Sequence, residues 1–139
     1  MGLLRYQALG MLWKYVRAHK GRLALALGLD ISGSVDAGEY RQQLDGLATA
    51  LNSPAVRDVL FAQSAAPVRI SVYEWSGPED QHIILPWTDL SAPADLALAT
   101  ATLHNHQRPT ATLTTAIGSA LLAGFNLLEG QDDCWKRTL

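Results

Sequence analysis

Apolar and polar residues alternate along the chain in patterns that predict both strands and helices. The apolar run Leu23–Asp30 is continuous and ends in turn residues, which is typical of a central parallel strand covered by helices on both faces. Asp36 and Glu39 then form a capping-box-like pair, and apolar residues follow at helical spacing. A strand beginning at Val68 and another at Gln81–Trp87 flank a turn, so we expect them to pair antiparallel.

The chain also predicts three further helices and a final strand. Ser53-Pro54 begins a short helix, and Ser91–His106 predicts a longer one. A further helix should follow Thr115, with one apolar face formed by Ile117, Leu121, Phe125 and Leu128. Cys134–Leu139 should begin the next strand. This order predicts an α/β fold: a doubly wound, Rossmann-like, mostly parallel sheet with one antiparallel edge strand, in three αβα layers.

Length and composition narrow the class of protein. The chain has 139 residues, enough for one domain, and its 48% hydrophobic content is that of a globular core. The net charge of −2 comes from scattered residues, which leaves no basic surface for nucleic acid, and no apolar run is long enough to span a membrane. A single cysteine, Cys134, excludes an internal disulfide.

The first 21 residues predict an amphipathic extension. Leu9, Leu12, Trp13 and Val16 lie near helical spacing, while basic residues interrupt the apolar stretch, so a signal peptide is not indicated. We expect this helix to pack on the sheet edge; the alternative is a position on a membrane surface. The domain proper should then cover residues 22–139.

The loop after the first strand carries the candidate chemistry. Asp30, Ser32 and Ser34 form the pattern Asp-x-Ser-x-Ser, one carboxylate and two hydroxyls, which are hard oxygen donors suited to Mg²⁺ or Mn²⁺. Spacing by two residues lets a turning loop direct all three at one centre. With only one charged ligand, a bound cation would stay electrophilic, and an acidic group from a partner could complete its coordination shell. The alternative is a strand end followed by a helix-capping serine cluster.

These residues resemble a known family. DISGS is similar to the metal-ion-dependent adhesion site of the von Willebrand factor A domain. The longer run DISGSVDAGEYRQQLDGLATAL, together with YEWSG at Tyr73–Gly77 and TAIGSAL at Thr115–Leu121, is closer still to a bacterial branch of that fold, the domain-of-unknown-function 1194 group. That branch brings no established activity.

The resemblance implies a ligand set and a partner. Thr115 matches the position of the threonine ligand on a second loop, so the implied metal ligands are Asp30, Ser32, Ser34 and Thr115. The neighbouring Thr114 could take this role if the loop shifts, and a helix cap is the alternative role for Thr115. The partner would be a protein that presents an acidic residue. The family would continue into a strand ending in a further Asp, whereas this sequence stops at Leu139, so we expect a partial domain. Relatives are often exported, which leaves the localisation open.

Two other functions compete with this interpretation. One is a metal-dependent phosphoryl hydrolase, for which Glu74 and His82 are available, although no spacing directs them at Asp30. The other is a truncated fragment without a working metal site. His104 and His106 could suggest a metal pair, but residues two apart on a helix point in different directions, so we expect a surface helix end there. We therefore expect a binding module, not an enzyme.

Overall fold

The computed structural model describes residues 22–62, 66–110, 114–131 and 136–138. Its strands are β1 (Leu23–Asp30), β2 (Val68–Trp75), β3 (Gln81–Leu90) and β4 (Lys136–Thr138). Its helices are α2 (Ala37–Leu51), α3 (Pro54–Leu60), α4 (Pro93–Asn105) and α5 (Ile117–Glu129). The amphipathic extension predicted for residues 1–21 lies outside the described residues, as does Cys134.

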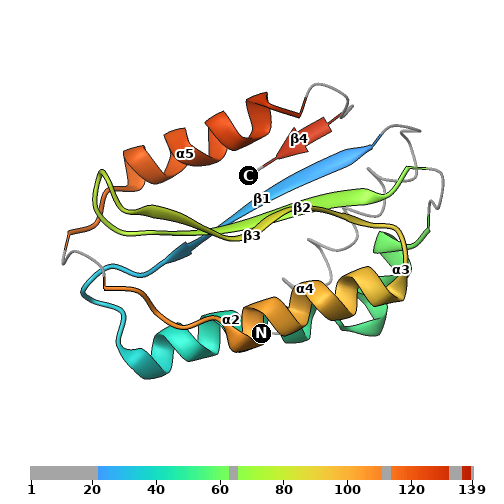
Figure 1. Cartoon of the computed structure of the whole chain (residues 1–139), viewed down its shortest axis with the longest axis horizontal. Helices are drawn as coiled ribbons and strands as arrows, with labels where there is room; N and C mark the ends of the chain where they lie inside the picture. The colour runs from blue at the N-terminus through green and yellow to red at the C-terminus, as the bar shows by residue number, and fades with distance from the viewer. Residues whose placement is uncertain (1–21, 63–65, 111–113, 132–135, 139) are drawn as a thin grey trace.

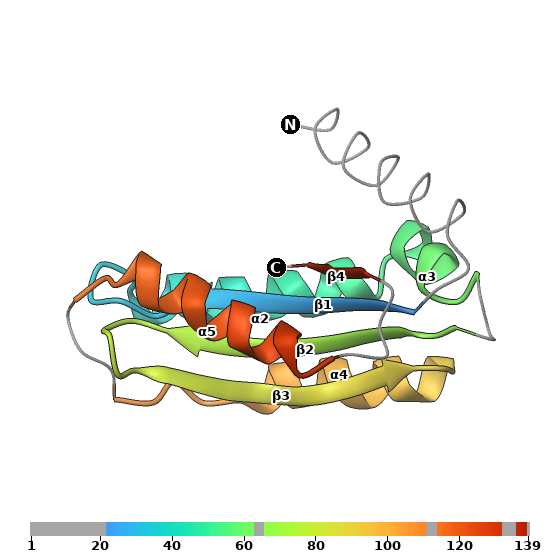
Figure 2. The same ribbon diagram turned by 90° about the horizontal axis from the view of Figure 1, so that it is seen from above.

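The predicted α/β class is confirmed, with a mixed sheet in the order β3-β2-β1-β4. β1 pairs in parallel with both of its neighbours, and β3 pairs antiparallel with β2 at the edge of the sheet, as predicted for the strand after the turn. Helix α5 lies on one face of the sheet, while α2 and α4 lie side by side on the other (Figures 1 and 2). None of the helices in these ranges is long and apolar enough to cross a membrane.

Large and small residues alternate along β1, and this alternation sets the distance to each helical layer. The leucines at positions 23, 25, 27 and 29 pack toward the main core with α2 and α4, while Ala24 and Ala26 are buried on the α5 side. Successive strand residues face opposite sides of a sheet, so Gly28 and Asp30 share the α5 side with the alanines. The small residues let α5 approach the sheet closely.

Tyr73 fills the space that Gly28 leaves. The two residues are register partners on β2 and β1, and a Cβ atom at Gly28 would lie 2.8 Å from both Cζ and Oη of Tyr73. The Tyr73 hydroxyl donates a hydrogen bond of 2.8 Å to the carbonyl oxygen of Ala120 in α5. Burial raises the pKa of this phenol above its usual value. The ring therefore links the sheet to α5 only because position 28 has no side chain.

The apolar face predicted for α5 is wrong in part. Ile117, Leu121 and Phe125 are 60%, 55% and 53% exposed, whereas Ala120, Gly124 and Leu128 are buried. The two sets form neighbouring stripes of the same helix, each at a spacing of four residues, and periodicity alone cannot choose between them. The stripe with small residues faces the sheet because α5 lies close to the small residues of β1 and to the Tyr73 ring, where larger side chains would not fit.

Helix α2 begins as the sequence predicts. The Asp36 carboxylate accepts a hydrogen bond of 2.8 Å from the backbone N–H of Glu39, and the Glu39 carboxylate accepts one of 2.9 Å from the N–H of Asp36. This capping box fixes where the loop after β1 ends and the helix begins. Tyr40 and Leu44 then lie on the buried face of α2.

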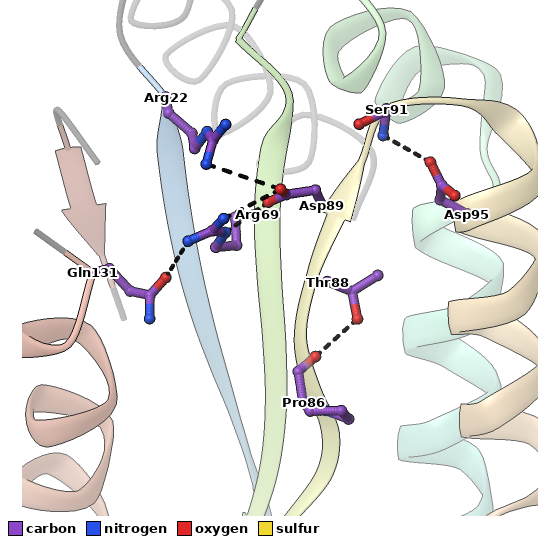
Figure 3. A network of polar contacts seen from close by, with 8 residues as sticks. All are labelled: Arg22, Arg69, Pro86, Thr88, Asp89, Ser91, Asp95 and Gln131. Atoms are coloured by element: carbon purple, nitrogen blue, oxygen red, sulfur yellow. Dashed lines mark hydrogen bonds and ion pairs between the residues drawn. The ribbon is translucent and has the colours of Figure 1, made fainter. Parts of the chain in front are cut away.

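A charged network joins the strands at the end of the sheet where β1 begins (Figure 3). Arg69 at the start of β2 makes two hydrogen bonds to Asp89 near the end of β3, from Nε at 2.6 Å and from Nη2 at 3.2 Å. Its Nη1 donates to Gln131 after α5 at 2.8 Å, and Arg22 forms an ion pair with Asp89 at 3.9 Å. The hydrogen bond from Arg69 holds the pKa of Asp89 below its usual value.

The Gly28–Tyr73 contact leads to a paired prediction. Gly28→Ala should destabilise the fold by about 1–3 kcal/mol, because the new methyl group overlaps the Tyr73 ring. Gly46→Ala, at an exposed position of helix α2 with open space around it, should stabilise the fold by about 0.5–1 kcal/mol. Urea unfolding of both variants tests this, and equal effects at the two positions would contradict it.

The Arg69–Asp89 pair predicts a pH-dependent stability. A carboxylate with a lowered pKa in the folded state stabilises the fold above its unfolded pKa of about 3.9, and this contribution disappears as pH falls through the folded value. Because Asp89 is partly exposed, we expect Asp89→Asn to cost only about 1 kcal/mol at pH 7. Urea unfolding from pH 7 downwards should show this difference shrinking below pH of about 4. Asp58→Asn, at an exposed position of α3, is the control, and a difference for Asp89→Asn that persists at low pH would contradict the assignment.

Candidate metal centre

The loop after β1 places three candidate ligands at the carboxyl end of a central strand. The backbone N–H of Ser32 donates a 2.7 Å hydrogen bond to Oδ1 of Asp30, which turns the loop back toward the strand end. The hydroxyl oxygens of Ser32 and Ser34 lie 3.3 Å apart. Ser32 is fully buried, Asp30 is half-buried and Ser34 is exposed. The structure therefore brings these three predicted residues together in one loop.

Thr115 lies on a second loop at the same end of the sheet. The segment before α5 and the loop after β1 meet this end in both views (Figures 1 and 2). The N–H of Ala116 donates a 2.7 Å hydrogen bond to the carbonyl of Ser76, which directly follows β2, and Ile31 bonds to Trp75 on the same strand. The exposed Thr115 is thus attached to the end of β2, next to the strand that carries Asp30. Within the described ranges, its hydroxyl makes no hydrogen bond to Asp30, Ser32 or Ser34.

The donor set suits a hard cation with several water ligands. Adjacent oxygens around octahedral Mg²⁺, bound at about 2.0–2.1 Å, lie about 2.9 Å apart. The 3.3 Å between the hydroxyl oxygens of Ser32 and Ser34 is close to this value. Among the described residues, no three His, Cys, Asp or Glu side chains form a group that could hold a metal. A cation at this loop would therefore depend on hydroxyls and water beside the single Asp30 carboxylate.

Side chains from elsewhere satisfy the backbone of this loop. Arg108, in the connection after α4, donates from Nη1 to the carbonyl of Val35 and from Nη2 to the carbonyls of Ile31 at 2.9 Å and Ser32 at 3.3 Å. Gln43 in α2 donates a 3.0 Å hydrogen bond to the carbonyl of Asp30. The loop conformation is therefore fixed by partners on two other segments.

A buried carboxylate lies on the α2 and α4 side of the sheet, close to this loop. Glu74 of β2 is fully buried and accepts a 3.0 Å hydrogen bond from the Tyr40 hydroxyl, while Nε2 of His106 lies 3.3 Å from both of its carboxylate oxygens. Burial raises the pKa of the Tyr40 phenol above its usual range, and the negative charge of Glu74 adds to the effect. The guanidinium of Arg108 lies 5.5 Å from the centre of the Tyr40 ring, which connects this cluster to the loop.

The two histidines of the predicted helix end have separate partners. Nδ1 of the exposed His104 lies 2.9 Å from Asp45 of α2, whereas His106 contacts Glu74. The helix ends at this point as expected, with His106 as its C-cap. His106 is less exposed than expected for a surface helix end, because its side chain lies against Glu74.

Sequence patterns alone did not indicate the residues that support the loop after β1. The position of Glu74 could have been predicted, because it lies two and four residues after Val72 and Ile70 and so shares their buried face of the strand. A carboxylate on that face needs hydrogen-bond partners. No such pattern indicated Arg108, because its partners are 73 to 77 positions away in the sequence.

Comparison with known proteins gives a family but no activity. A search of curated proteins gives no match to this chain. The family model described as "Protein of unknown function (DUF1194)" matches residues 20–139, which include every described element of the structure. The chain therefore belongs to the DUF1194 family.

Proposed function

We propose that this chain is a non-enzymatic protein-binding module of the von Willebrand factor A type that depends on Mg²⁺ or Mn²⁺. The observation that carries the proposal is the loop at the carboxyl end of β1, where Asp30 precedes two serine hydroxyl oxygens 3.3 Å apart. Ligands of open α/β sheets bind at this end of the strands. The proposal includes the finer fold assignment, a doubly wound Rossmann-like sheet, which is supported by the parallel pairing of β1 on both sides and by helices on both faces.

Each candidate ligand has a distinct role in this proposal. Asp30 supplies the negative charge that attracts the cation, and Ser32 and Ser34 supply neutral oxygens from the same loop. Thr115 supplies a fourth oxygen from the loop before α5. The bound cation would be an electrophilic centre for a carboxylate of the partner protein.

The pattern of exposure supports access by a partner. Ser32 is fully buried on the protein side of the loop, whereas Ser34 and Thr115 are exposed. A cation held by these residues would have protein on one side and solvent on the other. An acidic side chain of the partner could then replace a water ligand without displacing any protein group.

The surroundings of the loop favour binding over hydrolysis. Metal-assisted hydrolysis generally needs a base or second carboxylate directed at the attacking water. Glu74 is fully buried and bonded to Tyr40 and His106, and His82 is exposed on the edge strand β3. Neither residue contacts Asp30 in the described part of the chain. We therefore assign no catalytic role.

The proposal predicts cation-dependent stability. Mg²⁺ at about 100 times its dissociation constant should stabilise the folded chain by about 2.7 kcal/mol, since a ligand that binds only the folded state shifts unfolding by mass action. Thermal unfolding with Mg²⁺ or Mn²⁺ should therefore show a rise of several degrees in Tm. Asp30→Asn, which keeps an oxygen acceptor for the Ser32 N–H but removes the charge, should abolish the rise.

Two further variants define the ligand set. Thr115→Val should weaken the response, because it removes one oxygen donor while keeping a side chain of similar volume. Asp58→Ala, an exposed carboxylate on α3 at the opposite end of the sheet, should keep the full response (Figure 1). A wild-type Tm that is unchanged by both cations would refute cation binding, and cation-dependent turnover of a phosphate ester that is lost in Asp30→Asn would replace the binding module with a hydrolase.

A further inference from the structure

The side chain of Arg108 forms hydrogen bonds with the backbone of the candidate loop at three residues. Its guanidinium donates to the carbonyls of Ile31, Ser32 and Val35, which span the segment that carries both serines. These carbonyls have few other partners: that of Ser32 also accepts from the N–H of Val35 at 2.9 Å. The planar fork of an arginine can bond several carbonyls at once, which the single ammonium of a lysine cannot do in the same geometry.

The guanidinium is itself held in place. It lies against the ring of Tyr40, at 5.5 Å from the ring centre, and the Tyr40 hydroxyl donates to the fully buried Glu74. His106, two residues before Arg108, also contacts Glu74. The connection after α4 is therefore attached to the sheet on one side and to the loop on the other.

We propose that Arg108 is the positioning residue of the candidate metal centre. It fixes the backbone from Ile31 to Val35, so that the hydroxyls of Ser32 and Ser34 stand side by side before any cation binds. This inference deepens the proposed function and rests on it for the identity of the ligand, while the effect on the loop itself can be measured without a cation.

A positioning role and a purely electrostatic role of Arg108 predict opposite changes in Mg²⁺ affinity when its charge is removed. Arg108 is a cation close to a cation site, so a purely electrostatic role predicts that removing its charge strengthens Mg²⁺ binding. A positioning role predicts the opposite, because the hydroxyls lose their arrangement. Removing a group that orients metal ligands typically weakens metal affinity by about 10- to 100-fold.

Arg41 offers a matched control. It also donates to two carbonyls of the same region, those of Leu103 at 3.1 Å and His106 at 3.2 Å, but in the described structure it has no contact with the loop after β1. Arg41→Gln removes one positive charge, two carbonyl hydrogen bonds and a 3.2 Å ion pair with the exposed Asp45, whereas Arg108→Gln removes one charge and three carbonyl hydrogen bonds. Differences between the two variants therefore report on the loop and not on general stability.

The first measurement is amide hydrogen exchange of the cation-free full chain, followed by NMR. In Arg108→Gln, the amides of Ser32 and Val35 should exchange about five- to tenfold faster, which is the factor for the loss of about one net hydrogen bond. Arg41→Gln should leave these two amides at the wild-type rate. Should Arg108→Gln not fold, Arg108→Lys keeps the charge and should still show faster exchange at both amides.

The second measurement is the dissociation constant of Mg²⁺ from the change in Tm with concentration. Arg108→Gln should weaken binding by about 10-fold or more, and Arg108→Lys should weaken it as well although the charge is kept. Arg41→Gln should bind Mg²⁺ as the wild type does. Unchanged or tighter Mg²⁺ binding in Arg108→Gln, or wild-type exchange at Ser32 and Val35, would overturn the proposal. A wild type that binds no Mg²⁺ would instead contradict the proposed function, and the exchange rates would still decide whether Arg108 fixes the loop.

Discussion

The carbonyl groups of the loop after β1 need hydrogen-bond partners although the loop has no regular structure, and this need organises the site. Partly buried backbone groups that lose water must be bonded elsewhere in the protein. Here the guanidinium of Arg108 and the amide of Gln43 supply the donors from other segments. Because these side chains donate the hydrogen bonds to the loop carbonyls, the hydroxyls of Ser32 and Ser34 are not needed for that purpose and lie next to each other. The proposed metal centre would use these two hydroxyls, which the fold does not need for its backbone hydrogen bonds.

The buried Glu74 links the arrangement of the loop after β1 to the layer formed by α2 and α4. A carboxylate removed from water is costly to leave without hydrogen-bond partners. Tyr40 from α2 and His106 from the end of α4 both bond to Glu74, so the two helices are connected through one strand residue. Arg108 follows His106 closely and rests on the Tyr40 ring. The position of the loop is therefore linked to the packing of α2 against α4, and not only to the end of β1.

The sequence predicted the parts of this structure that local patterns determine. The bounds of β1 and the Asp36–Glu39 capping box follow from neighbouring residues, and both are confirmed. The strand at Gln81 and its antiparallel pairing also followed from a turn between two alternating segments. Asp30, Ser32 and Ser34 come together because they are close in the sequence, so a short motif was enough to place them.

What the sequence did not predict depends on partners that are distant along the chain. The orientation of α5 depends on its contacts with Tyr73 and with the small residues of β1. The apolar stripe with Ile117, which periodicity favoured as the buried face, is exposed. The bonds of Arg108 to the loop cross more than 70 residues. Periodicity describes which residues can share a face, but it does not say which face finds a partner.

The polar side chains at the two ends of the sheet are bonded in different ways, and this difference bears on how the proposed cation would bind. At the end where β1 begins, Arg69, Asp89 and Gln131 bond mainly to one another, so their polar groups are used by the fold. At the other end, Arg108 bonds to the backbone carbonyls of the loop, His106 bonds to the buried Glu74, and the hydroxyls of Ser32 and Ser34 lie next to each other. A site whose backbone is already fixed pays little conformational entropy when a ligand arrives. In the proposed metal centre, the affinity would then depend on the ligand oxygens and on the partner, because Arg108 and Gln43 already hold the loop backbone.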